Sequence, residues 1–118
     1  MLKFAFVIIL MFLPVVWNCS VNFHFNNLDN RQSFTARVWG PYLRRSSQKM
    51  INPGETAYYL AEGTFFMCTG KYEVLIKGRP GSKEFRDVRY FFFDSTAVLN
   101  ITEAVDGSVA VNYDVREH

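Results

Sequence analysis

The sequence is poor in the residues that build most active sites. Its 118 residues include two histidines and two cysteines, with no close spacing between them. A nucleophilic pair would need Cys68 and His24, and nothing near either residue activates it. Zinc sites use three or four such ligands at short spacings. We therefore expect no metal and no cofactor, and no motif predicts catalysis.

Neither sign of charge dominates the chain. Lys and Arg number 13 against 11 Asp and Glu, which gives a formal net charge of +2. A dedicated polyanion binder concentrates one sign of charge, so this balance argues against a nucleic-acid partner. No acidic cluster is visible, and single carboxylates such as Glu55 are typical of solvated turns. One alternative stays open. The protein is a small secreted hydrolase if a carboxylate pair or a site around His24 assembles only in the folded chain.

Long apolar runs are confined to the N-terminus. Lys3 is followed by an apolar segment of 14 residues that ends at Trp17. As a helix this segment measures about 21 Å, whereas the hydrocarbon core of a bilayer is about 30 Å thick. A charged start, an apolar run and a less apolar end have the order of a secretory signal peptide. We predict a leader over residues 1–20, an extracellular protein (periplasmic in a bacterium) and no transmembrane segment after leader removal.

The fate of Cys19 depends on where this leader is cut. Cleavage after Cys19 or Ser20 leaves Cys68 as a lone buried thiol, and this is the favoured interpretation. Cleavage before Cys19 permits a Cys19–Cys68 disulfide that closes a loop of about 50 residues. It also permits a lipid on Cys19, although Val16-Trp17-Asn18 lacks the small residues of a bacterial lipobox.

Residues 21–118 are predicted to form a single all-β domain. Apolar and polar residues alternate in several short segments, and no segment keeps a 3.6-residue period. The clearest alternating segments are 21–25, 34–39, 57–61 and 71–77. Turn signals recur about every 8–12 residues: a polar turn region at 26–30, the strong signal Asn52-Pro53-Gly54-Glu55, and Glu62-Gly63. Roughly seven to eight strands indicate a two-sheet antiparallel β-sandwich, immunoglobulin-like in architecture, with a small Greek-key barrel as the alternative.

Three segments in the second half of the chain carry specific expectations. Tyr90-Phe91-Phe92-Phe93 has no polar alternation, which predicts a buried strand because an exposed aromatic run is an aggregation hazard. Leu99 and Ile101 are predicted to pair with the strand 109–115 across an Asp106-Gly107 turn. Asn100-Ile101-Thr102 is an N-glycosylation triplet, and the alternation places Asn100 on an exposed polar face.

Basic loops and aromatic side chains supply the candidate binding residues. The set is Trp39, Tyr42, Arg44, Arg45, Lys49, Lys77, Arg79 and Lys83. Loops at the ends of a sandwich often carry recognition, and basic loops suit an acidic protein surface, a sulfated glycan or anionic lipid headgroups. Exposed rings such as Trp39 would form a sugar-stacking or protein-binding platform. Solvated loops and rings that simply pack are the structural alternatives.

The sequence therefore favours a secreted, non-catalytic binding module with a protein or glycan partner. Two alternatives remain: the small hydrolase described above, and a membrane-active, toxin-like protein with Phe-rich strands and basic loops.

Overall fold

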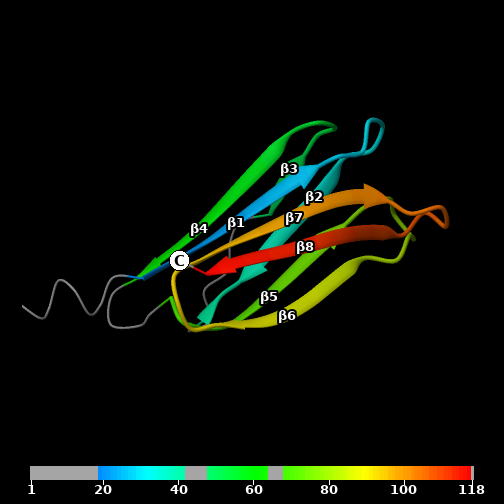
Figure 1. Cartoon of the computed structure of the whole chain (residues 1–118). Coiled ribbons are helices and arrows are strands. Elements are labelled where there is room, and N and C mark those ends of the chain that lie inside the picture. Colours follow the sequence, from blue (N-terminus) through cyan, green and yellow to red (C-terminus); the bar gives the residue numbers. More distant parts are fainter. Residues whose placement is uncertain (1–18, 42–47, 64–67, 118) are drawn as a thin grey trace, which may run out of the picture.

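The protein is a sandwich of two four-stranded β-sheets (Figure 1). The computed structural model describes residues 19–41, 48–63 and 68–117. The strands are β1 (Cys19–Asn27), β2 (Phe34–Trp39), β3 (Lys49–Ile51), β4 (Thr56–Gly63), β5 (Gly70–Lys77), β6 (Phe85–Phe91), β7 (Ser95–Glu103) and β8 (Val109–Glu117). This confirms the predicted all-β sandwich. In the described ranges, no helix is long and apolar enough to cross a bilayer.

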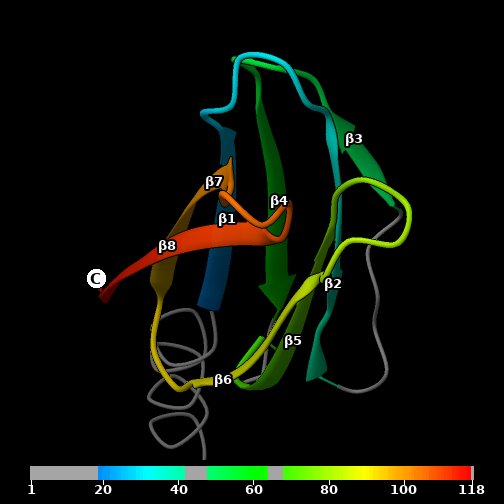
Figure 2. The same cartoon turned by 90° about the vertical axis from the view of Figure 1, so that its right-hand side faces the viewer.

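The strand order corrects two details of the prediction. Sheet A has the order β4-β1-β7-β8 and sheet B the order β3-β2-β5-β6 (Figure 2). β1 and β7 pair in parallel, with Val21 opposite Ser95, so sheet A is mixed rather than purely antiparallel. The immunoglobulin-like topology is not confirmed. In immunoglobulin constant domains the first two strands share a sheet, whereas here β1 and β2 lie in different sheets.

The core between the sheets is built around aromatic rings. Phe23 of β1 lies at its centre, with ring centroids 5.5 Å from Tyr72 and 5.8 Å from Phe91. The alternation predicted for β2 is confirmed, because its even-numbered residues are buried and its odd-numbered residues face outward. The residues of β2 that enter the core are Phe34, Ala36 and Val38.

The aromatic run at the end of β6 is not buried as predicted. Phe91 is 4% exposed, but Tyr90, Phe92 and Phe93 are 63%, 65% and 62% exposed. β6 lies at the edge of sheet B, with one face against the core and the other outward. A period of two therefore buries Phe91 and turns Tyr90 and Phe92 outward, while Phe93 lies beyond the end of the strand.

A disulfide joins the start of β1 to the segment before β5. Cys19 and Cys68 are bonded, with their Cα atoms 5.9 Å apart. The disulfide alternative is thus confirmed, and Cys68 is not a lone thiol. Beside it, the Tyr72 hydroxyl donates to the Cys68 carbonyl at 2.6 Å, and the Ser20 N–H donates to Asp94 Oδ1 at 2.8 Å. The leader over residues 1–20 remains a prediction, since residues 1–18 lie outside the described ranges.

The predicted turns are present, with one exception. Gly54 has a φ of 78°, and the Glu55 N–H donates to the Asn52 carbonyl at 3.0 Å, as the Pro53-Gly54 pair predicts. The last hairpin places Leu99 opposite Tyr113, with Gly107 at a φ of 86° in its turn. Glu62-Gly63, expected to be a turn, continues β4.

Inward-pointing charges close the side of the sandwich between β6 and β8. Arg89 Nε lies 2.9 Å from Asp87 Oδ2, and the Arg89 guanidinium lies 4.0 Å above the Tyr113 ring. The Tyr113 hydroxyl is buried without a hydrogen-bond partner. Burial raises the pKa of Tyr113 well above its usual value. Such charges on an edge strand disfavour pairing with a foreign strand.

Removing this hydroxyl with Tyr113→Phe is expected to raise the free energy of unfolding by about 1 kcal/mol, because an unsatisfied buried group is lost while the ring stays. The raised pKa also makes the wild type lose stability as the pH climbs above about 10, where unfolded tyrosine ionises first. Urea unfolding at pH 7 and pH 10.5 measures both effects. Equal stability of the two proteins at both pH values would contradict the expectation.

Candidate functional site

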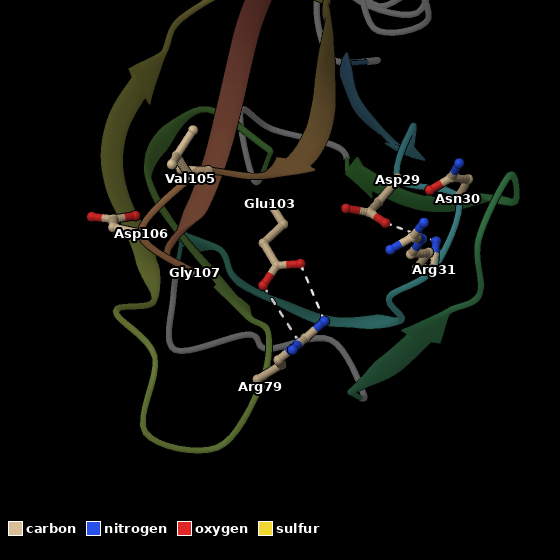
Figure 3. A pocket seen from close by; sticks show the side chains of 9 residues that line it. Asp29, Asn30, Arg31, Arg79, Glu103, Val105, Asp106 and Gly107 are labelled. Atoms are coloured by element: carbon tan, nitrogen blue, oxygen red, sulfur yellow. Dashed lines mark hydrogen bonds and ion pairs between the residues drawn. The ribbon is translucent and has the colours of Figure 1, made fainter.

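An open depression lies at the end of the sandwich where the β7–β8 hairpin meets two other loops (Figure 3). Its volume is about 620 Å³. The residues that line it are Asp29, Asn30, Arg31, Arg79, Glu103, Ala104, Val105, Asp106 and Gly107. We call it the end pocket. Several carboxylates and cations meet in this depression, so it is a place to look for acid–base chemistry.

The Arg79–Glu103 ion pair occupies one wall of the end pocket (Figure 3). Arg79 Nε and Nη2 each lie 3.4 Å from one Glu103 oxygen. With its amide nitrogen toward Glu103, the buried Gln32 donates to both oxygens of that carboxylate, at 3.2 and 2.8 Å. Its amide oxygen then accepts the Arg79 N–H at 2.8 Å. Glu103 is therefore neutralised and fully hydrogen-bonded, as a structural carboxylate is.

The two aspartates of the end pocket are turn caps. Asp29 accepts the N–H groups of Arg31 and Gln32 at 2.8 and 3.1 Å, and the Arg31 N–H above all holds the pKa of Asp29 below its usual value. The Ser108 hydroxyl, 2.6 Å away, does the same for the pKa of Asp106. A general acid at neutral pH needs a raised carboxyl pKa. The end pocket is thus arranged to hold loops together.

The outer face of sheet B is different in character. It combines exposed apolar side chains with cations on three neighbouring strands. Its members are Arg37, Trp39, Lys71, Lys77, Arg86, Val88, Tyr90 and Phe92, which we call the aromatic-basic face. Val88, Tyr90 and Phe92 follow one another on the outward side of the edge strand β6 and of the residue after it, and the Tyr90 and Phe92 rings stack with centroids 6.4 Å apart.

The cations of this face are only partly neutralised. Arg86 lies 2.8 Å from Glu73 and 3.5 Å from Glu84. Within the described residues, Lys71 and Lys77 form no ion pair and both are exposed. The Arg37 guanidinium lies 5.8 Å from the Trp39 ring centroid, which is cation–π distance. The face therefore keeps a net positive charge between its aromatic side chains.

The structure separates the predicted binding residues. Trp39 and Lys77 both belong to the aromatic-basic face, and Trp39 faces outward, half-buried beside Arg37. Arg79 lies in the end pocket, where Glu103 binds it. Lys83 is exposed in the loop between β5 and β6.

Other predicted residues do not join the face. Lys49 is half-buried in the edge strand β3, and its Nζ donates to the Tyr58 carbonyl of β4, so it links the sheets. Tyr42, Arg44 and Arg45 lie outside the described residues.

The outer face of sheet A is mostly uncharged and includes the exposed side chains of Tyr58 and Leu60 on β4. Asn100 is half-buried there rather than exposed, and its Oδ1 accepts a hydrogen bond from Asn26 Nδ2 at 3.0 Å. His24 is half-buried, with its ring 4.9 Å from the exposed Tyr58 ring. Its proposed nucleophilic partner, Cys68, is in the disulfide. Glycosylation of Asn100 remains a prediction.

Sequence reasoning left Lys71, Tyr90 and Phe92 out of the candidate set. Alternation along β6 does predict the direction of the two aromatic side chains. Phe85 and Phe91 are both odd-numbered, so if they face the core, the even-numbered residues such as Tyr90 face outward. Lys71 meets Tyr90 only through the β5–β6 register. Proximity across strands of that kind does not follow from alternation within one strand.

Comparisons of the sequence with protein-family models and with curated proteins find no match. In residues 19–41, 48–63 and 68–117, no group of three or more His, Cys, Asp or Glu side chains is placed to hold a metal ion. The chemistry of the aromatic-basic face is therefore the observation on which a function can be built.

Proposed function

We propose that this protein is an exported, non-catalytic binding module that contacts its protein or glycan partner through the aromatic-basic face. The observation that carries the proposal is the row Val88, Tyr90 and Phe92, exposed on the outer side of β6 and of the residue that follows it. A monomer with no partner normally turns such side chains inward, and exposed apolar patches mark interaction sites. Aromatic residues and Arg are also the types enriched at protein interfaces.

Export is supported by two independent features. The first is the N-terminal apolar segment with the order of a signal peptide. The second is the Cys19–Cys68 disulfide, because such bonds persist in oxidising compartments. A mature protein that keeps this bond must keep Cys19, so we propose that the leader is cut before Cys19. N-terminal sequencing of the secreted protein tests this cleavage point.

The end pocket does not have the features of a hydrolytic site, which favours a binding role for the protein. Its carboxylates are tied to Arg79, Ser108 and backbone N–H groups, and the pKa values of Asp29 and Asp106 are lowered. Neither aspartate is therefore poised to deliver a proton at neutral pH, and the Glu103 carboxylate is held by Arg79 and Gln32. The aromatic-basic face, in contrast, offers unpaired cations and exposed rings that are available to a partner without rearrangement.

The test compares two double variants that remove similar exposed side chains from opposite sheets. Tyr90→Ser with Phe92→Ser removes the row on β6, and Tyr58→Ser with Leu60→Ser is the matched control on β4, where Tyr58 is 59% exposed. Both variants should keep their stability within about 0.5 kcal/mol, because these are surface sites. Saturable binding of the labelled protein to extracellular material and glycan arrays should weaken about tenfold or more in the β6 variant alone.

Three results would overturn the proposal. One is equal binding by the β6 and β4 variants, which would remove the aromatic-basic face from recognition. Another is turnover of a substrate that depends on a residue of the end pocket, which would make the protein an enzyme. Release of dye from anionic vesicles by the wild type would likewise replace binding with membrane disruption.

A further inference from the structure

The aromatic-basic face contains a small hollow between strands β2 and β5. It has a volume of about 30 Å³, and its lining residues are Thr35, Ala36, Arg37, Gln48, Leu75 and Lys77. Four of these residues carry hydrogen-bond donors on their side chains. A space of this volume holds one water-sized group, such as a single oxygen of a ligand, and no sugar ring.

One donor at this hollow, Arg37 Nε, has no partner within the described residues. Arg37 Nε is buried without a hydrogen-bond partner, and the Arg37 Nη2 bond to Gln48 Oε1 is long, at 3.4 Å. Within the described residues neither Arg37 nor Lys77 forms an ion pair. An unpaired buried donor on this half-buried cation calls for an anion or water from outside. Two cations flanking a hollow with hydroxyl and amide groups favour a negatively charged oxygen.

The charges beyond the hollow extend this preference along the sheet. Lys71 and Lys77 lie on the same side of β5, six positions apart, which corresponds to about 20 Å along a strand. Lys71 lies opposite Tyr90 in the β5–β6 ladder. Glu73, which lies between the two lysines on β5, is opposite Trp39 in the β2–β5 ladder. Cations and aromatic rings therefore share one surface, with a ring beside Lys71 and another between the two lysines. An extended chain whose rings stack and whose anionic groups recur matches that arrangement.

We infer that the partner is a linear sulfated glycan and that the hollow between Arg37 and Lys77 receives an oxygen of one of its sulfo groups. This inference rests on the proposed function, because it names the ligand of the same aromatic-basic face. The near-neutral net charge of the chain does not oppose it. On the outer face of sheet B, Glu73 and Glu84 are engaged by Arg86, which leaves Arg37, Lys71 and Lys77 without an ion pair within the described residues.

The probe is a heparin-derived octasaccharide, titrated against the full secreted protein at 0.15 M salt and followed by intrinsic fluorescence, to which Trp39 contributes. The double variant Lys71→Gln, Lys77→Gln should weaken binding about 25-fold, at an average of about fivefold for each cation near a polyanion. The control, Arg31→Gln with Arg116→Gln, removes the same charge from the end pocket and from sheet A and should change binding less than about twofold. Singly, Lys77→Gln should cost more than Lys71→Gln, because Lys77 lines the hollow.

Two comparison probes identify the chemistry. The chemically desulfated octasaccharide should lose most of the binding, and polyglutamate of equal charge should bind weakly. If polyglutamate binds as tightly as the sulfated sugar, the partner is an acidic polypeptide and the glycan inference is wrong. If the lysine variant and its control behave alike, the hollow is not the site.

These failures are distinguishable from failure of the proposed function. One outcome overturns only the sulfated ligand. In it, the Tyr90→Ser, Phe92→Ser variant loses extracellular binding, and the wild type does not bind the heparin octasaccharide. The aromatic-basic face would then still be the binding surface. Equal binding by the β6 and β4 variants would overturn both.

Discussion

Replacing both cysteines with serine is expected to lower the free energy of unfolding by about 4 kcal/mol. Cys19 and Cys68 are 49 positions apart. Cross-linking a loop of that length lowers the conformational entropy of the unfolded chain, which corresponds to a free energy of roughly 4 kcal/mol. Domains of this size have a total stability of about 5–15 kcal/mol. The Cys19→Ser, Cys68→Ser variant should therefore be close to unfolding at physiological temperature.

Urea unfolding of the secreted protein measures this effect, with reductant as the matched control. Adding a thiol reductant should move the midpoint of the wild type down to that of the double variant and leave the variant unchanged. A wild-type midpoint that does not respond to reductant would show that the bond does not form in the secreted protein. Cleavage of the leader after Cys19 would give that result, because only Cys68 would then remain.

The bond also matters for the position of the aromatic-basic face. Cys19 begins β1, and the next residue, Ser20, donates its N–H to Asp94 in the connection from β6 to β7. Phe92 lies in the same connection, directly after the last residue of β6. Loss of the disulfide is therefore expected to loosen the end of sheet B at which the stacked rings lie, and so to weaken binding even where the chain stays folded.

Strand positions could be predicted from the sequence because alternation is a local signal. Residues 34–39 were predicted as a strand and form β2 with the same bounds, and Tyr72, Val74 and Ile76 of β5 are buried as their spacing requires. Turn chemistry was equally local, as Gly54 and Gly107 show. Each of these predictions needs only the residues within one short segment.

The errors came from relations between distant segments. The parallel pairing of β1 with β7 joins residues 74 positions apart, such as Val21 and Ser95, and no local pattern records it. Parity within β6 turns Tyr90 and Phe92 away from Phe91, but which side of β6 faces the core depends on how the two sheets pack, and that is not a local property. The charge on the aromatic-basic face arises in the same way, since Arg37, Lys71 and Lys77 come together only across a ladder.

The structural role of Asn27 is not visible in the sequence, because the segment 26–30 is mostly polar and is interpreted as a turn. It is 1% exposed at the end of β1. Its Nδ2 donates to the carbonyls of Gln32 at 2.8 Å and Ile51 at 2.9 Å, and its Oδ1 accepts the Asp29 N–H at 3.0 Å. One buried amide thus connects the start of sheet B, through Gln32 and Ile51, to the loop that carries Asp29.

Substituting Asn27→Ala is expected to lower the free energy of unfolding by about 3 kcal/mol or more, because two carbonyls and one N–H lose their partner in a site with little access to water. Asn26→Ala is the matched control. Asn26 bonds Asn100 and Thr56 on the half-exposed outer face of sheet A, where water can replace the lost bonds, so about 1 kcal/mol is expected. Urea unfolding of the two variants gives both values. Equal losses in the free energy of unfolding would mean that burial of the Asn27 amide does not strengthen the contribution of its hydrogen bonds to stability. Hydrogen exchange should also accelerate at Asp29 in the Asn27 variant alone, because its N–H then lacks an acceptor.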